Sequence, residues 1–155
     1  MTNSKPLQAK KSDISWMVDL SHAKRANYEK AQKQFWKMAP NSNQIQSQFF
    51  AQEIDKTNVL ALCDHKKRGF VIGKIISPPE VYDAGLTLMI DDFCVKSPEL
   101  WGSVGVELFT EICALAKLKN AKQVLAVCGD HDLEKLAFLK KLNLSVSSNW
   151  LVSPL

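Results

Sequence analysis

The pattern of apolar and polar positions changes period along the chain, and each change predicts a new element. Short apolar runs, which are typical of strands, occupy residues 7–11, 59–63, 70–76, 86–95, 123–128 and 144–152. Apolar residues three or four positions apart, which are typical of helices, recur over residues 12–36, 43–56, 104–119 and about 132–142. The resulting order is strand, two helices, three strands, helix, strand, helix and strand. This order predicts one mixed α/β domain over residues 1–155.

Capping and turn residues support these boundaries. Ser12, followed by Asp13, is a typical helix start, and Pro40 separates the first two helices. The polar segment DHKKRG joins two apolar runs and predicts an antiparallel hairpin. Asp130 or Asp132 is expected to cap the last helix.

The stretch LTLMIDDFCVKSPELWGSVGVELF, residues 86–109, concentrates the candidate chemistry. Its apolar strand carries two adjacent carboxylates, Asp91 and Asp92, although a buried carboxylate is costly. Small residues, Gly102, Ser103 and Gly105, then stand at the start of an apolar helical pattern, where unpaired backbone N–H groups can face an anion. A strand that delivers acids beside such a helix start indicates a site.

Composition and charge narrow the class of protein. The 46% hydrophobic and 23% charged content is typical of a soluble globular domain, and no apolar run approaches the roughly 20 residues of a membrane span. The N-terminus lacks the apolar core of a secretory signal, so we expect a cytoplasmic protein. Residues 1–80 carry 13 basic against 7 acidic side chains, which favours either a phosphate-bearing ligand or merely solvated helix faces. Because aromatic residues do not interleave with these basic clusters, nucleic-acid binding is not favoured.

Cysteine and histidine spacing gives no metal signature. The four cysteines, at positions 63, 94, 113 and 128, form no C-x-x-C pair and fall within apolar patterns. We therefore expect buried free thiols in a reducing compartment. The three histidines are scattered, and no zinc-ligand spacing is present.

Four segments, read together with the order of elements, resemble one family. RGFVIGKII, IDDFCV, GSVGVELF and FLKKLNL resemble the third strand, the acidic fourth strand, the phosphate loop and the closing helix of the GNAT superfamily of acyl-coenzyme A-dependent N-acetyltransferases. The resemblance implies a mixed, mostly antiparallel sheet that splays between its fourth and fifth strands, flanked by about four helices. It also implies acetyl-coenzyme A (acetyl-CoA) as co-substrate and no metal.

The resemblance assigns the cofactor to the same stretch. Backbone groups of Phe93 and Val95 would bind the pantetheine arm, and Asp132 stands where the family often has an asparagine near the cofactor, although a helix cap explains it equally well. The pyrophosphate would lie on the backbone amides of Gly102, Ser103, Val104, Gly105 and Val106. The loop departs from the family pattern, because Leu100 replaces the leading polar residue and Ser103 replaces a glycine. Alternatively, Ser97-Pro98-Glu99 is an ordinary helix start and Gly102 relieves crowding.

Acetyl transfer to an ammonium substrate requires a base. Asp91 stands where many relatives carry a glutamate, and it is preferred over Asp92, which should face the other side of the strand unless a bulge changes the phase. Both carboxylates can instead hold the bulge. Leu139 replaces the tyrosine that protonates the leaving thiolate in many relatives, which leaves solvent, Cys128 or His131, although the two side chains can also be a core thiol and a loop residue.

The acceptor is expected over the first two helices and the loop before the fourth strand. Tyr28, Trp36 and Tyr82 are the candidate contacts, and the two acids favour a primary amine such as a polyamine, an aminoglycoside-like amine or a protein lysine. One alternative is a non-catalytic coenzyme A-binding or protein-interaction module; another is a toxin-like enzyme acting on charged transfer RNA. The apolar end Trp150-Leu151-Val152 can contribute to a homodimer.

Overall fold

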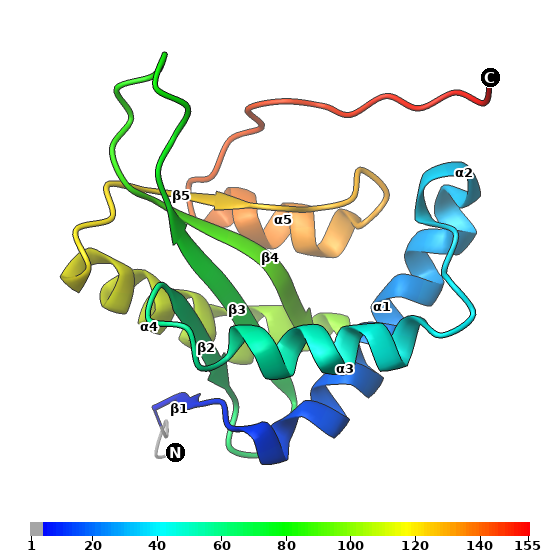
Figure 1. The fold of residues 1–155 in the computed structure, drawn as a ribbon, viewed down its shortest axis with the longest axis horizontal. Coiled ribbons are helices and arrows are strands. Elements are labelled where there is room, and N and C mark those ends of the chain that lie inside the picture. Colours follow the sequence, from blue (N-terminus) through cyan, green and yellow to red (C-terminus); the bar gives the residue numbers. More distant parts are fainter. Residues whose placement is uncertain (1–4) are drawn as a thin grey trace.

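A five-stranded sheet separates two layers of helices (Figure 1). The structure is a computed structural model and describes residues 5–155. Its elements are β1 (Leu7–Gln8), η1 (Lys11–Asp13), α1 (Ile14–Ala31), α2 (Lys33–Trp36), α3 (Ser42–Glu53), β2 (Val59–Cys63), β3 (Gly69–Ile76), β4 (Thr87–Val95), η2 (Pro98–Gly102), α4 (Val104–Leu118), β5 (Gln123–Ala126) and α5 (Leu133–Lys141).

The sheet has the order β1-β2-β3-β4-β5, antiparallel except for the parallel pair β4 and β5. Met17 and Phe50, from α1 and α3, pack on one face of the sheet. Leu108 and Phe138, from α4 and α5, pack on the other face, against Phe93. Because side chains alternate between the faces of a strand, the central strands β2, β3 and β4 contribute to both cores. The predicted mixed, mostly antiparallel α/β fold is confirmed.

A bulge in β4 decides where its two acids point. Ile72 pairs with Asp92 but the next residue, Gly73, pairs with Ile90, so Asp91 is the extra residue of the bulge. The extra residue shifts the alternation by one position. Asp92 therefore faces α1, while Phe93 returns to the side of α4 and α5.

The fourth and fifth strands part at this bulge. β5 pairs only with Thr87 to Ile90, and the last contact is the Val127 N–H donating to the Ile90 carbonyl at 3.0 Å. The second half of β4, residues 91–95, has no partner on that side within the described residues. The predicted splay is confirmed, and it can be followed in Figure 1, where β5 and β4 diverge.

Two sequence predictions are wrong. Residues 144–152 form no strand, because they lie against no strand edge and the ring of Trp150 contacts Phe35 instead. The first helix does not continue to Trp36: it ends at Ala31, where Gln32 adopts φ −146° and its side chain accepts a hydrogen bond from the Phe35 N–H. This break raises the number of α-helices in the described chain to five. Smaller differences shorten the first strand to two residues and end β5 at Ala126.

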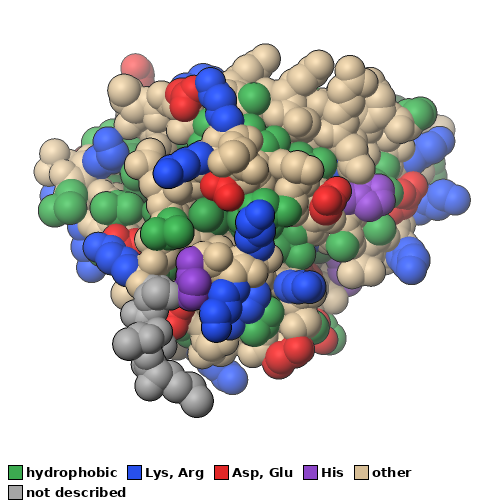
Figure 2. Space-filling view, turned by 90° about the horizontal axis from the view of Figure 1, so that it is seen from below, with side chains coloured by type: hydrophobic (Ala, Val, Ile, Leu, Met, Phe, Trp, Pro, Cys, Tyr) green, Lys and Arg blue, Asp and Glu red, His purple; other side chains and the backbone are tan. Residues whose placement is uncertain are grey.

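The surface shows no single block of charge on its lower face. Figure 2 shows this side, where basic side chains are interspersed with acidic and apolar ones. The excess of basic residues in the N-terminal half therefore does not gather into one patch on this face. None of the helices in residues 5–155 is long and apolar enough to cross a membrane.

Candidate functional site

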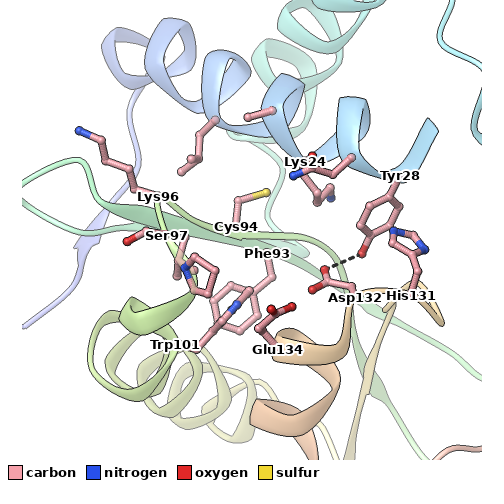
Figure 3. A pocket seen from close by; sticks show the side chains of 15 residues that line it. Lys24, Tyr28, Phe93, Cys94, Lys96, Ser97, Trp101, His131, Asp132 and Glu134 are labelled. Carbon is pink, nitrogen blue, oxygen red and sulfur yellow. Dashed lines mark hydrogen bonds between the residues drawn. The ribbon is translucent and has the colours of Figure 1, made fainter. Parts of the chain in front are cut away.

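A cavity of about 330 Å³ lies beside the second half of β4, where β5 has turned away (Figure 3). The walls come from α1, from β4 and its continuation into η2, and from the loop that enters α5. The lining residues are Leu20, Ala23, Lys24, Asn27, Tyr28, Phe93, Cys94, Val95, Lys96, Ser97, Pro98, Trp101, His131, Asp132 and Glu134. The splay therefore opens onto a cavity.

Tyr28 and Asp132 join the two sides of this cavity. The Tyr28 hydroxyl donates to Asp132 Oδ2 at 3.1 Å and accepts from the Gly129 N–H at 3.2 Å. Asp132 also caps α5, since its other oxygen accepts from the Lys135 N–H at 3.3 Å. The His131 ring packs edge-on against Tyr28, with ring centroids 4.4 Å apart, and its Nε2 is buried without a partner in the described chain. Burial raises the pKa of Tyr28, which therefore stays protonated.

Lys24 occupies the α1 wall and engages Asp92. Its ammonium donates to Asp92 Oδ1 at 3.2 Å and lies 5.8 Å from the centre of the Tyr28 ring. Burial works to lower the pKa of Lys24, but Cys94 and the Asp92 carboxylate act against it and hold the pKa above its ordinary value. Lys24 thus remains charged, and the Asp92 carboxylate forms an ion pair with it.

Lys135 is a buried lysine that the sequence reasoning missed. It is 1% exposed and makes no ion pair with an acid in the described chain. Burial lowers the pKa of Lys135, and the nearby Lys24 ammonium lowers it further. The position in the first turn of α5 opposes the charge as well, because the helix dipole is positive there. The signal was present in the sequence: Lys135, Phe138 and Leu139 share the i, i+3, i+4 spacing of one buried helix face.

The start of α4 supplies backbone donors beside the cavity, not inside it. The first helical bond runs from the Glu107 N–H to the Ser103 carbonyl, so the amides of Val104, Gly105 and Val106 precede the hydrogen-bonded ladder. Gly102 and Ser103 are exposed, whereas Val104 and Gly105 are buried. The neighbouring Pro98 and Trp101 line the cavity.

The two glycines of this loop have different surroundings, so the space around each one differs. A Cβ on Gly105 would lie 2.8 Å from the Trp101 ring, so this glycine allows Trp101 to pack against α4. A Cβ on Gly102 would meet nothing within 4 Å, so open space surrounds this position. Trp101 itself stacks on Phe138 at 4.8 Å and meets Phe93 edge-on at 4.9 Å, and it forms a wall of the cavity that sequence reasoning did not anticipate.

The structure brings only part of the predicted site together. Tyr28, Phe93, Val95 and Asp132 line the cavity. Trp36 does not line it but contacts the Tyr28 ring at 5.1 Å. Tyr82 is 65% exposed in the connection between β3 and β4, outside the cavity.

Asp91 also lies outside the cavity. The residue is exposed at the bulge of β4, but the surrounding chain removes part of the water around its carboxyl group, and this desolvation, with the neighbouring Asp92 charge, raises the pKa of Asp91. Cys128, a candidate proton donor, contacts the carbonyls of Gly129 and Asp132, and burial raises its pKa to about 11. A thiol that holds its proton this tightly is a poor acid near neutral pH.

All four cysteines are free thiols, of which Cys63 and Cys94 are buried and Cys113 and Cys128 half-buried. Across residues 5–155, no group of three or more His, Cys, Asp or Glu side chains is arranged to hold a metal ion.

The mixed α/β fold, with its five-stranded, mostly antiparallel sheet, matches the GNAT fold of solved acetyltransferases. The BH1408 protein from Bacillus halodurans, solved as a mutant, has a TM-score of 0.85 at 15% identity, with 98% of this chain and 99% of that chain covered. A predicted acetyltransferase from Clostridium acetobutylicum, solved with acetyl-CoA, has a TM-score of 0.71 at 13% identity, covering 97% and 95%. AAC(6')-Iy, solved with the bisubstrate analogue CoA-S-monomethyl-acetylneamine, has a TM-score of 0.67 at 8% identity, covering 97% and 96%. No family model and no curated protein matches the chain.

Proposed function

We propose that the chain is an acetyl-CoA-dependent N-acetyltransferase that acts on a primary amine by direct attack within a ternary complex. The observation that carries this proposal is the splay. β5 leaves β4 after Ile90, and the unpaired second half of β4 borders the cavity. Free strand backbone beside a cavity is what an extended amide-bearing ligand such as pantetheine can bind.

The residues present fit two parts of acetyl-CoA, the pantetheine arm and the pyrophosphate. Backbone groups of Phe93 and Val95 would bind the pantetheine arm, and Asp132 would contact it across the cavity. The exposed Gly102–Ser103 turn and the amides that begin α4 would hold the pyrophosphate. When bound, acetyl-CoA supplies the thioester whose acetyl group is transferred to the amine.

The chain must also remove a proton from the amine. Asp91 is the proposed base: its carboxylate is exposed, makes no ion pair in the described chain, and has a raised pKa. Asp92 is a weaker candidate, because Lys24 holds its carboxylate. Because Asp91 lies outside the cavity, we propose that the proton reaches it through water.

The acceptor would approach from the side of α1 and α2. Tyr28 and the adjacent Trp36 are the contacts that we propose there, and the acceptor remains a small primary amine or a protein lysine. Tyr82 is also proposed as an acceptor contact, but only the sequence supports it, because this residue lies outside the cavity.

A second function is favoured by specific observations. Asp92 is neutralised by Lys24, Asp91 lies outside the cavity, and Leu139 is buried in the core where the resemblance places a tyrosine in many members of the family. A non-catalytic coenzyme A-binding or protein-interaction module of the same fold needs neither a free base in the cavity nor a tyrosine at position 139.

One experiment separates the two functions. The melting temperature of the protein is recorded with and without acetyl-CoA, and thiol release is then followed across a panel of primary amines. The proposal predicts a rise in melting temperature and amine-dependent thiol release. A rise without thiol release on any amine favours the coenzyme A-binding module. No rise contradicts both the transferase and the coenzyme A-binding module, and favours the protein-interaction module.

A further inference from the structure

Lys135 is a buried charge that the packing of the fold does not explain. The residue lies in the first turn of α5, is 1% exposed, and makes no ion pair with an acid in residues 5–155. Burial of an unpaired ammonium costs free energy, because the charge loses its water and gains no counter-charge. A residue that breaks a folding rule at such a cost is a candidate for a functional role.

The groups that act electrostatically on Lys135 come from both sides of the splay. Cys94 belongs to the second half of β4, which β5 has left, and Cys128 follows the end of β5. The other groups are Lys24 on α1, Asp91 at the bulge of β4 and Asp132 at the start of α5. The Lys135 ammonium is therefore close to the place where the two strands part.

Lys135 approaches the cavity from behind its wall. The residue does not itself line the cavity, but Lys24, Cys94 and Asp132 do, and each of them acts on its ammonium. Figure 3 shows these three side chains coming from α1, β4 and the start of α5. A proton donor in such a position can reach a group in the cavity directly or through one water.

The other protonated groups around the cavity hold their protons tightly. The pKa values of Tyr28 and Lys24 are raised, and the Tyr28 hydroxyl already donates to Asp132. Burial raises the pKa of Cys128 to about 11. Among these groups only Lys135 has a lowered pKa, because burial and the Lys24 ammonium both act against its charge. A donor whose pKa moves toward neutrality gives up its proton more readily.

We propose that Lys135 is the proton donor to the sulfur that leaves in the acetyl transfer; this inference rests on the proposed function. As the amine nitrogen bonds to the acetyl carbon, the C–S bond breaks and its electron pair stays on sulfur. The Lys135 ammonium gives that sulfur a proton and becomes a neutral amine, while the proton of the attacking amine goes to Asp91 through water. Solvent then restores the ammonium. The thiolate is the counter-charge that Lys135 lacks, so the favourable pairing arises only as the thiolate forms.

The thiol of bound coenzyme A provides a test that needs no turnover. Its thiolate is followed by ultraviolet absorbance against pH, with a coenzyme A analogue that lacks the sulfur as the blank. Binding to the native protein should raise the ratio of thiolate to thiol about 10-fold over free coenzyme A at a given pH, because an ammonium favours the thiolate. Lys135→Met should remove most of this increase. Lys140→Met, the matched control on the exposed side of α5, should behave as the native protein.

Turnover gives the second test. At saturating substrates Lys135→Met should lower kcat by about 10²-fold and leave the KM for acetyl-CoA unchanged, because the proton is needed only as the C–S bond breaks. The ratio of native to variant kcat should fall as the pH rises through the lowered pKa of Lys135, since a donor acts only while it holds its proton. The two proteins share every other titrating group, so this ratio isolates Lys135. Lys140→Met should match the native protein at every pH.

The outcomes distinguish the role of Lys135 from the proposed function. Absence of coenzyme A binding contradicts the proposed function and the role of Lys135 together. Binding with equal thiolate fractions in the native and Lys135→Met proteins overturns the role of Lys135 alone, and so does an equal kcat in the two. A lower kcat whose ratio to the native value stays constant with pH overturns proton donation as well.

Discussion

The Tyr28 hydroxyl donates to Asp132 Oδ2 at 3.1 Å and thereby ties α1 to the first turn of α5 across the opening between β4 and β5. The two residues are 104 positions apart in the sequence. Because Asp132 also caps α5 and Tyr28 also receives the Gly129 N–H, this contact holds together three segments that border the cavity. The Tyr28–Asp132 hydrogen bond therefore links α1 to the start of α5 at the place where β4 and β5 are no longer paired.

Tyr28→Phe removes the hydroxyl and leaves the buried ring in place. We expect it to lower the free energy of unfolding by about 1–2 kcal/mol, because the Gly129 N–H loses its acceptor and Asp132 loses a donor. Asp132→Asn should cost a similar amount, and the double variant should cost less than the sum, since the two residues share one bond. Urea unfolding of the four proteins measures this. Additive losses would show that the two side chains are not coupled.

Replacement by alanine should destabilise the protein at one of the two loop glycines and have almost no effect at the other. Gly105→Ala places a Cβ 2.8 Å from the Trp101 ring and should destabilise the protein by about 1–3 kcal/mol. Gly102→Ala is the matched control, because nothing lies within 4 Å of the added atom; it should change stability by less than about 0.5 kcal/mol. Thermal melts compare the two variants. Equal melting temperatures would contradict the packing of Trp101 against α4.

Lys135→Met should stabilise the protein at neutral pH, by about 1–3 kcal/mol, because a buried unpaired ammonium is replaced by an apolar side chain of similar length. The folded state lowers the pKa of Lys135 below its ordinary 10.5. Between these two pKa values only the unfolded chain binds the proton, so the stability of the native protein rises with pH there.

The advantage of the Lys135→Met variant should therefore shrink as the pH rises toward 10.5. Urea unfolding of both proteins at about pH 7 and about pH 9.5 isolates this effect, because they share every other titrating group. A difference that stays constant with pH would show that Lys135 has an ordinary pKa in the folded protein.

Replacement of the two acids of β4 should have different effects, one on turnover and the other on stability. Asp91→Asn should lower kcat at saturating acetyl-CoA by about 10²-fold or more and leave the melting temperature unchanged, since Asp91 is exposed and unpaired in the described chain. Asp92→Asn should lower the melting temperature, because it leaves the Lys24 ammonium without its carboxylate. Unchanged kcat in Asp91→Asn would remove that residue as the base.

Much of the fold follows from local sequence pattern. The boundaries of β2 agree with the prediction and those of β3 differ by one residue, because DHKKRG is unsuited to a strand and the flanking runs are strongly apolar. Residues 144–152 carry a strand pattern but form no strand, because such a pattern reports what a segment can do, whereas strand formation also requires pairing with a neighbouring strand.

The site was less predictable, because it is assembled from residues far apart in the chain. The ion pair of Lys24 with Asp92 and the pair of Tyr28 with Asp132 both bridge separate elements, and no spacing rule connects such residues. The bulge at Asp91 reverses the direction of Asp92, and strand alternation alone does not reveal it. The burial of Lys135 was readable from helical spacing, but a lysine at such a position is usually exposed.

Binding of acetyl-CoA tests the central claim most directly. Isothermal titration of the protein with acetyl-CoA, up to about 1 mM to cover the usual range of substrate affinities, should show one site per chain. Gly102→Glu places a carboxylate in the open space before α4, where the pyrophosphate would lie, and should abolish this binding while the melting temperature of the free protein stays unchanged. No binding heat from the native protein, or equal binding by the Gly102→Glu variant, would contradict the account of this site.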